Sequence, residues 1–254
     1  MVAEQGRPLK RQLPSSARRG SMLHMLFQTP DILALIYFLG AWIAYSIVIE
    51  RTAHGRDSLN ALMNLYRDQW MEELLARDMR MVDAQVTTAL QNGTAFFAST
   101  SLIAVGGALT LLRSTGEVIS LVSSLPFGAT PAAGQWEAKI LGLTVIFVYA
   151  FFKFAWSYRL YNYVAIMVGA APPKSQRKSR RAQEFAHRTA RICADAGRHF
   201  NRGQRAFFFA LGYLGWFLGP LVLALATTGV VIVMWRRQFA SESRLAFSQQ
   251  PPRS

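Results

Sequence analysis

Four long apolar stretches, three of them free of charged residues, constrain this chain more than any other feature. They cover residues 32–49, 94–112, 140–167 and 206–235. A helix rises about 1.5 Å per residue, so about 20 residues cross a hydrocarbon core about 30 Å thick. Only helices or closed barrels satisfy their backbone polar groups in lipid, and a continuous apolar pattern excludes a barrel. The sequence therefore predicts an all-α integral membrane protein, built as a four-helix bundle.

The polar parts of the chain suggest one membrane domain with two tails. Residues 1–28 form a basic segment without helical periodicity, which predicts a disordered tail, and residues 241–254 predict a flexible one. Residues 29–240 then hold the four spans. Pro30 and Asp31 precede the first apolar stretch in the order expected at a helix start, so Asp31 is expected to act as the N-cap.

The connections between the first and second spans and between the third and fourth spans are both patterned as helices. Residues 50–92 carry apolar side chains at steps of three and four, which predicts one long amphipathic helix. Residues 174–205 show a similar stripe beside ten Lys or Arg residues. The segment 113–139 between them is rich in Pro and Gly, so we expect a connection that lies along the membrane surface instead of a further span.

The fourth apolar stretch is unusually long. Its 30 residues, 206–235, exceed what the hydrocarbon core requires, so a single helix there must tilt, kink or protrude. Pro220 removes a backbone donor in the middle of the stretch and predicts a kink. Gly215 and Gly219 form a small-x-x-x-small pattern, which predicts close helix packing.

The balance of charge predicts the orientation. The chain has 28 Lys and Arg against 14 Asp and Glu, and basic residues accumulate on cytoplasmic loops, so we do not expect a nucleic-acid partner. Four spans divide the basic residues outside them into fifteen on the first and third connections and eleven elsewhere. This predicts that those two connections are cytoplasmic and that both termini lie outside the cytoplasm. The single cysteine, Cys193, excludes an intramolecular disulfide.

Several long phrases of the sequence resemble a known family. They are "NALMNLYRDQWMEELLARDMRMVDAQ", "FFASTSLIAVGG", "VYAFFKFAWSYRLYNYVAIMVGAAP" and "AGRHFNRGQRAFFFALGYLGWFLGP", in that order along the chain. They resemble segments of a bacterial inner-membrane family with plant relatives, domain of unknown function 599. The resemblance spans residues 31–239 and implies a four-helix membrane protein in the inner membrane, with no assigned reaction. Where the family phrase is expected to carry a His, this chain has Gly219, so no His ligand is carried over to that position.

The third apolar stretch holds the first candidate site. An ionisable side chain is costly in lipid and is functional by default, and Lys153 and Arg159 are the candidates there. With Trp156 on the same helix, and Asn162 and Arg202 near the predicted cytoplasmic face, they suggest a site for an anion or a lipid headgroup. The alternative is an aromatic belt with two cations that reach the interface.

The predicted topology brings further polar residues to the same face. We expect a structural polar cluster there, made by Glu50, Arg51, His54, Asp195, His199 and Asn201. Within it, His199 is expected to hydrogen-bond to Asp195, four residues earlier, or to a backbone carbonyl. Because the spans carry no paired His or Glu-x-x-His pattern, we expect no metal, haem or other cofactor.

The sequence does not define a reaction. No Gly-rich phosphate loop, nucleophile elbow or zinc-protease motif occurs, which favours a non-enzymatic component such as a channel or transporter subunit, or a scaffold that binds lipid or a partner protein. The alternative is a membrane-embedded enzyme that acts on lipid headgroups at the cytoplasmic face. The expected partners are anionic membrane lipids, with a homo-oligomer or a protein partner as further options.

Overall fold

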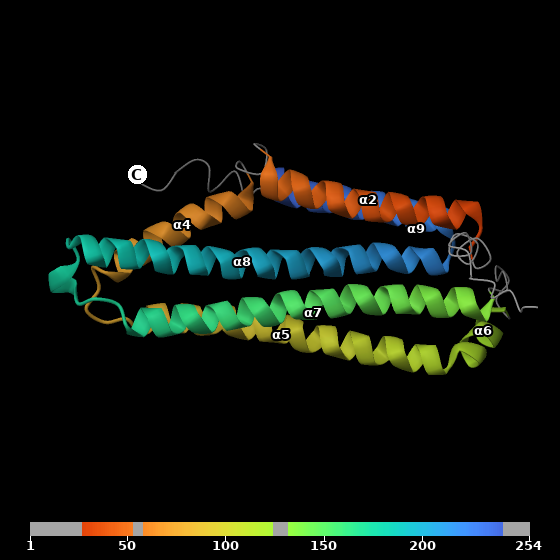
Figure 1. Cartoon of the computed structure of the whole chain (residues 1–254), viewed down its shortest axis with the longest axis horizontal. Coiled ribbons are helices and arrows are strands. Elements are labelled where there is room, and N and C mark those ends of the chain that lie inside the picture. Colours follow the sequence, from red (N-terminus) through yellow and green to blue (C-terminus); the bar gives the residue numbers. More distant parts are fainter. Residues whose placement is uncertain (1–26, 53–57, 124–131, 241–254) are drawn as a thin grey trace, which may run out of the picture.

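The protein is an all-α membrane bundle, as the apolar pattern predicts. The computed structural model describes residues 27–52, 58–123 and 132–240, and every element in those ranges is helical (Figure 1). Four helices are long and apolar enough to cross a membrane: α2 (Thr29–Arg51), α5 (Met81–Arg113), α7 (Ala133–Gly169) and α9 (Pro220–Phe239). They cover the first three predicted spans and the last part of the fourth. The predicted tails, apart from residues 27 and 28, lie outside the described residues.

The predicted fourth span is not a single helix. The apolar residues 206–214 complete α8 (Arg180–Leu214), the short helix η2 (Gly215–Phe217) follows, and α9 begins at Pro220. The chain reverses at Gly219, whose φ of 144° is one that side chains rarely adopt. Pro220 occupies the first turn of α9, where its missing N–H costs nothing. The predicted kink at Pro220 is therefore wrong, because the stretch forms a helical hairpin.

The hairpin makes α2 and α9 parallel neighbours. At the start of both helices, the Trp216 indole N–H donates to the Asp31 carboxylate at 2.7 Å. Further along, the hydroxyls of Tyr37 and Thr228 lie 2.8 Å apart. The end of α9 therefore lies beside the end of α2, near the middle of the bundle, whereas the start of α2 lies at one end of the bundle (Figure 1). Residues 1–26 and 241–254 lie outside the described residues, so the expectation that both termini lie outside the cytoplasm stays a prediction.

The predicted amphipathic helix over residues 50–92 is also divided. It forms α4 (Leu59–Leu74), a turn, and then the first part of α5. The carboxylate of Asp83, which is fully buried, accepts hydrogen bonds from the Trp70 indole at 2.7 Å and from the Arg77 guanidinium. Arg80 donates to the carbonyl of Ala171 at 2.7 Å. Side-chain contacts to distant residues thus fix this turn, although no Gly or Pro marks it in the sequence.

The segment 113–139 holds more helix than its composition suggests. Helix α6 (Thr115–Ser123) follows α5 directly, and α7 already begins at Ala133. Residues 124–131 lie outside the described residues, so their position along the membrane surface stays a prediction. The short helix η1 (Lys174–Gln176) lies between α7 and α8 at the other end of the bundle. Asp31 is not the N-cap of α2, because that position is taken by Gln28.

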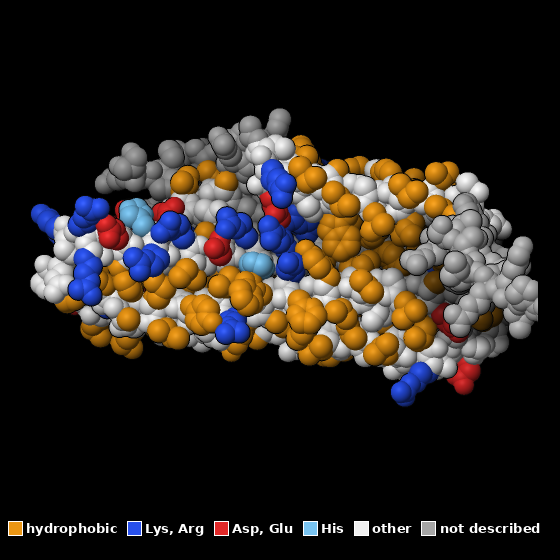
Figure 2. All heavy atoms as spheres, in the orientation of Figure 1, with side chains coloured by type: hydrophobic (Ala, Val, Ile, Leu, Met, Phe, Trp, Pro, Cys, Tyr) orange, Lys and Arg blue, Asp and Glu red, His pale blue; other side chains and the backbone are white. Residues whose placement is uncertain are grey.

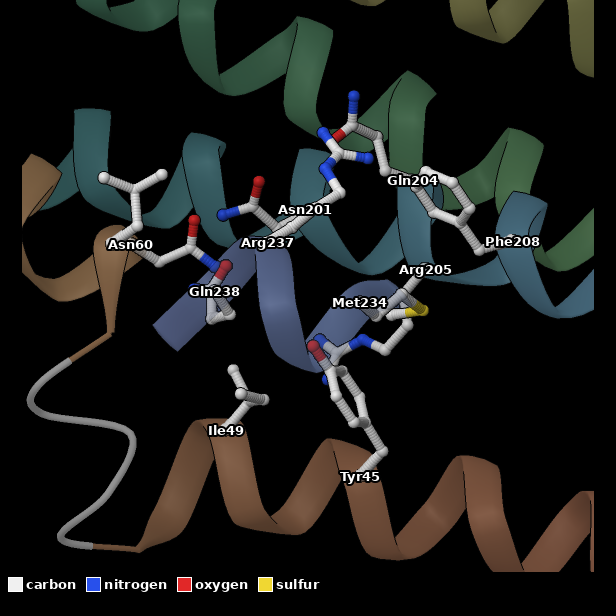
Figure 3. Close-up of a pocket in the computed structure, with 11 residues that line it drawn as sticks. Tyr45, Ile49, Asn60, Asn201, Gln204, Arg205, Phe208, Met234, Arg237 and Gln238 are labelled. Carbon is white, nitrogen blue, oxygen red and sulfur yellow. The ribbon is translucent and has the colours of Figure 1, made fainter. Parts of the chain in front are cut away.

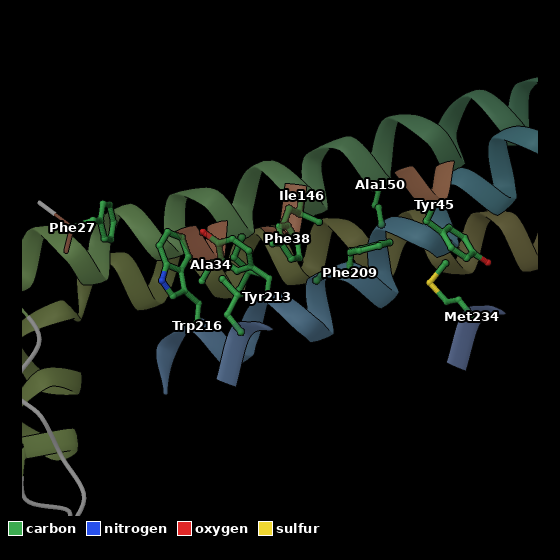
Figure 4. Packing of buried hydrophobic residues seen from close by; sticks show 14 of the residues in the cluster. Phe27, Ala34, Phe38, Tyr45, Ile146, Ala150, Phe209, Tyr213, Trp216 and Met234 are labelled. Atoms are coloured by element: carbon green, nitrogen blue, oxygen red, sulfur yellow. The ribbon is translucent and has the colours of Figure 1, made fainter. Parts of the chain in front are cut away.

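Two hydrophobic cores lie along the bundle. The first joins α2, α7, α8 and α9 through large side chains, among them Phe38, Phe154, Phe209 and Trp216 (Figure 4). The second joins α4, α7 and α8, where the buried face of α8 consists of small residues such as Ala186, Ala190 and Cys193. Basic side chains gather over α8 beside the second core, whereas hydrophobic side chains cover the surface beside the first (Figure 2). One half of the bundle is thus suited to lipid and the other to water.

Candidate functional site

A cluster of one carboxylate and two guanidiniums lies where the two halves meet. Glu50, at the end of α2, accepts hydrogen bonds from Arg202 of α8, whose Nε lies 3.0 Å from Oε1. Arg205, one turn further along α8, donates from Nη2 to the same oxygen at 2.6 Å. The pairing fixes the end of α2 against the middle of α8. It also places two positive charges against one negative charge.

Two adjoining cavities surround this cluster. One, of about 150 Å³, lies between α2, α4, α8 and α9 (Figure 3), and the other, of about 450 Å³, lies between α2, α4 and α8. They share Ile49, Asn60, Asn201 and Arg205 as lining residues. We call them together the arginine cavity, because five arginines line it: Arg51, Arg198, Arg202, Arg205 and Arg237.

The arginine cavity carries an excess of positive charge. Glu50 is the only acidic residue among its described lining residues, which leaves a formal excess of four positive charges. Asp195 lies just outside and pairs with Arg198, which lowers the excess locally. Burying a charge without a counter-charge is unfavourable, so a cavity of this composition favours an anionic ligand.

Arg205 is the residue least satisfied by the protein itself. It is 6% exposed, and its Nη1 is a buried nitrogen without a hydrogen-bond partner among the described residues. Its guanidinium lies over the ring of Tyr45, with 5.9 Å from Cζ to the ring centroid. On the other side of the cavity, Gln238 of α9 has a buried Nε2 that also lacks a partner. The site therefore has two unused donors that line the same cavity.

The predicted anion site is only partly assembled. Arg159 is exposed on α7, lies over the rings of Trp156 and Tyr163, and donates to the Tyr163 hydroxyl at 2.7 Å. Asn162 instead accepts a hydrogen bond from Gln91 of α5, at 2.5 Å. Arg159 and Asn162 thus belong to other contacts, whereas Arg202 lines the arginine cavity.

Lys153 lies on the same side as the site. Its ammonium lies 5.1 Å from the ring centroid of Tyr149, and its charge acts on His199 of α8. The ring of Trp156 packs edge-on against His199, with centroids 6.3 Å apart. These contacts connect α7 to α8 next to Arg202.

The structure brings together some residues of the predicted polar cluster and separates others. Glu50, Arg51 and Asn201 line the arginine cavity together, and His54 lies outside the described residues. The expected hydrogen bond from His199 to Asp195 is wrong, because Asp195 pairs with Arg198 and Nδ1 of His199 has no partner among the described residues. Burial, and then the charges of Lys153, Arg202 and Arg198, lower the pKa of His199 below its usual value.

Sequence reasoning missed three important parts of the site. The sequence pattern assigns Arg205 no role beyond the basic segment. It is, however, the last basic residue before the apolar residues of α8, and so the basic residue of that segment nearest to the apolar half of the bundle. The four-span topology predicts Arg237 on the face opposite to Arg205, because it does not include the hairpin. Asn60 begins an amphipathic helix, and nothing in the sequence pattern placed it beside α8.

A second polar cluster lies at the other end of α2. Lys139 of α7 is buried and donates to the carbonyl of Trp216 at 2.8 Å, while its ammonium lies 4.0 Å from the Asp31 carboxylate. Asp31 accepts the indole N–H of Trp216. This cluster is balanced in charge and its principal donors are used. Within the described ranges, no group of three or more His, Cys, Asp or Glu side chains is placed to hold a metal ion.

The fold and the site define a class before any relative is considered: an all-α membrane protein with an arginine-lined cavity at the edge of its apolar half. Residues 33–243 match the family described as "Protein of unknown function, DUF599". The chain belongs to this family, as its long phrases indicate. No curated protein and no solved structure shows significant similarity to the chain.

Proposed function

We propose that this protein is a multi-pass component of the bacterial inner membrane that binds a phosphate-bearing lipid headgroup in the arginine cavity, without catalysing a reaction. The observation that carries the proposal is Arg205, a buried cation that shares Glu50 with Arg202 and keeps one Nη free beside the cavity. Guanidinium groups match phosphate oxygens in bidentate geometry, and such charge-assisted hydrogen bonds are strong.

The charge distribution supports a cytoplasmic position for the site. If α2, α5, α7, α9 and the apolar end of α8 all cross the membrane, the chain makes five crossings. The four basic residues at and after the end of α9 then join the fifteen of the first and third connections, so the count becomes nineteen against seven. This bias is wider than that of a four-crossing chain and supports a position of the arginine cavity in the cytoplasmic leaflet. Anionic headgroups of that leaflet attract such basic clusters.

The proposal is tested by binding measurements on purified protein in nanodiscs. Arg205→Gln and Arg237→Gln remove charges that line the cavity, while Arg181→Gln removes an exposed charge on the same α8 helix and serves as the matched control. One lost charge-assisted bond weakens binding about tenfold or more. We therefore expect both cavity variants to lose preference for phosphatidylglycerol over phosphatidylcholine, and Arg181→Gln to keep it.

Arg237 is exposed, so its variant reports on binding even if Arg205→Gln folds poorly. Titration with inorganic phosphate separates a headgroup site from a site for a free anion. If the cavity is a site for a free anion, inorganic phosphate alone binds to the wild type as tightly as the lipid does. Equal lipid preference in all three variants would overturn the proposal.

A further inference from the structure

An apolar groove lies between α2 and α7 in the lipid-facing half of the molecule. Figure 2 shows it as a hollow lined by hydrophobic side chains, directly beside the basic side chains over the middle of α8. Its volume is about 720 Å³. Its walls are the facing sides of the two helices, represented by Leu35, Trp42 and Ser46 of α2 and by Gly142, Val145 and Tyr149 of α7.

The floor of the groove is built by the end of α8 and by η2. Tyr213 and Trp216 line it from below, and the rings of Phe38 and Tyr213 pack edge-on with centroids 5.4 Å apart. A Cβ placed on Gly142 would lie 2.0 Å from the Tyr213 hydroxyl oxygen, so only glycine lets this ring lie against α7. The groove is therefore a shaped surface of three helices.

The length of the groove fits a lipid tail. Its lining residues on α2 extend from Leu35 to Ile47, which is about 18 Å at about 1.5 Å per residue. One leaflet provides about 15 Å, half of a hydrocarbon core about 30 Å thick. A single acyl chain that enters from one surface thus reaches along most of the groove.

The two ends of the groove differ in charge. At one end, Glu50 lies one helical turn beyond Ser46 on α2 and binds Arg202 of α8. On α7, Lys153 lies one turn beyond Tyr149, and its ammonium lies over the Tyr149 ring. Arg202 also acts electrostatically on Tyr149. At the other end, Lys139 is already held by Asp31 and by the carbonyl of Trp216. Among the described residues, only the first end has basic groups in excess of its carboxylate.

We infer that the groove binds one acyl chain of an anionic glycerophospholipid, with the lipid phosphate at Arg202 and Lys153. This inference rests on the proposed headgroup site, because Arg202 lines the arginine cavity and, through its contact with Glu50, lies beside the polar end of the groove. The protein thus holds a lipid by its phosphate and by one tail. The acyl chain is already in an apolar medium in the bilayer, so the groove walls contribute van der Waals packing and not a hydrophobic term, and the charged end selects the headgroup.

The test uses vesicles that contain phosphatidylglycerol with a photoreactive diazirine in the middle of one acyl chain. Val145→Trp fills the groove, since Val145 lines it and is 67% exposed; Ile103→Trp, at a 75% exposed position on α5 outside the groove, is the matched control. In the wild type and Ile103→Trp, we expect crosslinks mapped by peptide sequencing to concentrate on 35–47 and 138–149. In Val145→Trp we expect at least a fivefold loss of those crosslinks.

Crosslinks spread evenly over the exposed faces of α5 and α7, unchanged in Val145→Trp, would overturn the inference. A parallel measurement with diazirine-labelled phosphatidylcholine separates the two proposals. If this lipid labels the groove as strongly as phosphatidylglycerol does, the groove binds a tail but the headgroup proposal fails.

Discussion

The two polar clusters at the ends of α2 solve the same problem in different ways. At one end, Asp31 and Lys139 are matched one to one, and Trp216 supplies both a donor and an acceptor between them. At the other end, Glu50 serves two arginines, and Arg205 keeps an unused donor. Buried charges are stable when they are paired and hydrogen-bonded. The first cluster is therefore complete as a structural clamp, whereas the second has the composition of a binding site.

The largest expected effect concerns the membrane face on which each cluster lies. We expect cysteines introduced at Ser175 and Ala240 to be protected from an impermeant maleimide in intact bacteria, and a cysteine at Gln28 to react, in a Cys193→Ala background. All three positions are exposed, so accessibility depends only on the membrane. Labelling should be nearly all-or-none. Reaction at Ala240 with protection at Ser175 would instead indicate an even number of crossings and would separate Arg237 from the site.

The next largest effect concerns the balanced cluster. Lys139→Met leaves the Asp31 carboxylate without its counter-charge, and breaking such a buried pair costs about 3 kcal/mol. Thermal unfolding in detergent should show a clearly lowered midpoint. Lys178→Met, at an exposed position, is the control and should leave the midpoint unchanged. Added phosphatidylglycerol should not restore Lys139→Met, since an anionic headgroup cannot replace the positive charge that Asp31 has lost.

Glu50→Gln tests the unbalanced cluster in the same way. It removes the carboxylate shared by Arg202 and Arg205, so we expect a loss of about 2 kcal/mol, which is smaller because Arg202 is partly open to water. Here phosphatidylglycerol should restore much of the thermal stability, because a phosphate can replace the carboxylate. If phosphatidylglycerol restores the thermal stability of Lys139→Met and of Glu50→Gln equally, the two clusters do not differ in their capacity to bind a phosphate.

The sequence predicts the helical class, and it predicts that the first three apolar stretches form helices long enough to cross a membrane. Both features depend on local composition. It does not predict the hairpin after α8, because the turn at Gly219 lies inside an unbroken apolar run with no polar residue to mark it. The excess length of that run was the available signal. The break before α5 is hidden for another reason: it depends on Asp83 of α5, whose partners are Trp70 of α4 and Arg77 of the turn itself.

The candidate site depends on the same long-range contacts. Glu50, Arg202 and Asn201 could be grouped from the predicted meeting of helix ends. Arg205 could not be distinguished from nine other basic residues, because its burial follows from the register between α2 and α8. Arg159 stands out in the sequence for the opposite reason. A charge within an apolar stretch attracts attention, yet α7 presents it on the exposed face beside Trp156 and Tyr163.

The smallest expected effect is the titration of His199, which reports on the charge of the unbalanced cluster. Burial lowers its pKa first, the charges of Lys153, Arg202 and Arg198 lower it further, and Glu50 opposes them. A histidine with a lowered folded pKa contributes stability that is present above its unfolded pKa of about 6.5 and is lost as the pH falls through the folded value. The protein should therefore lose a small part of its stability below about pH 6.5 through this residue.

This titration can be followed by NMR of the imidazole ring. We expect Lys153→Gln to raise the pKa of His199, because it removes the largest cause of the lowered pKa after burial. Phosphatidylglycerol in place of phosphatidylcholine should raise it in the wild type, since a bound phosphate offsets the same positive charges. Arg188→Gln, two helical turns or more from His199 on α8, should leave it unchanged and is the control. If neither Lys153→Gln nor the lipid changes the pKa of His199, the excess positive charge of the cluster does not act on this histidine.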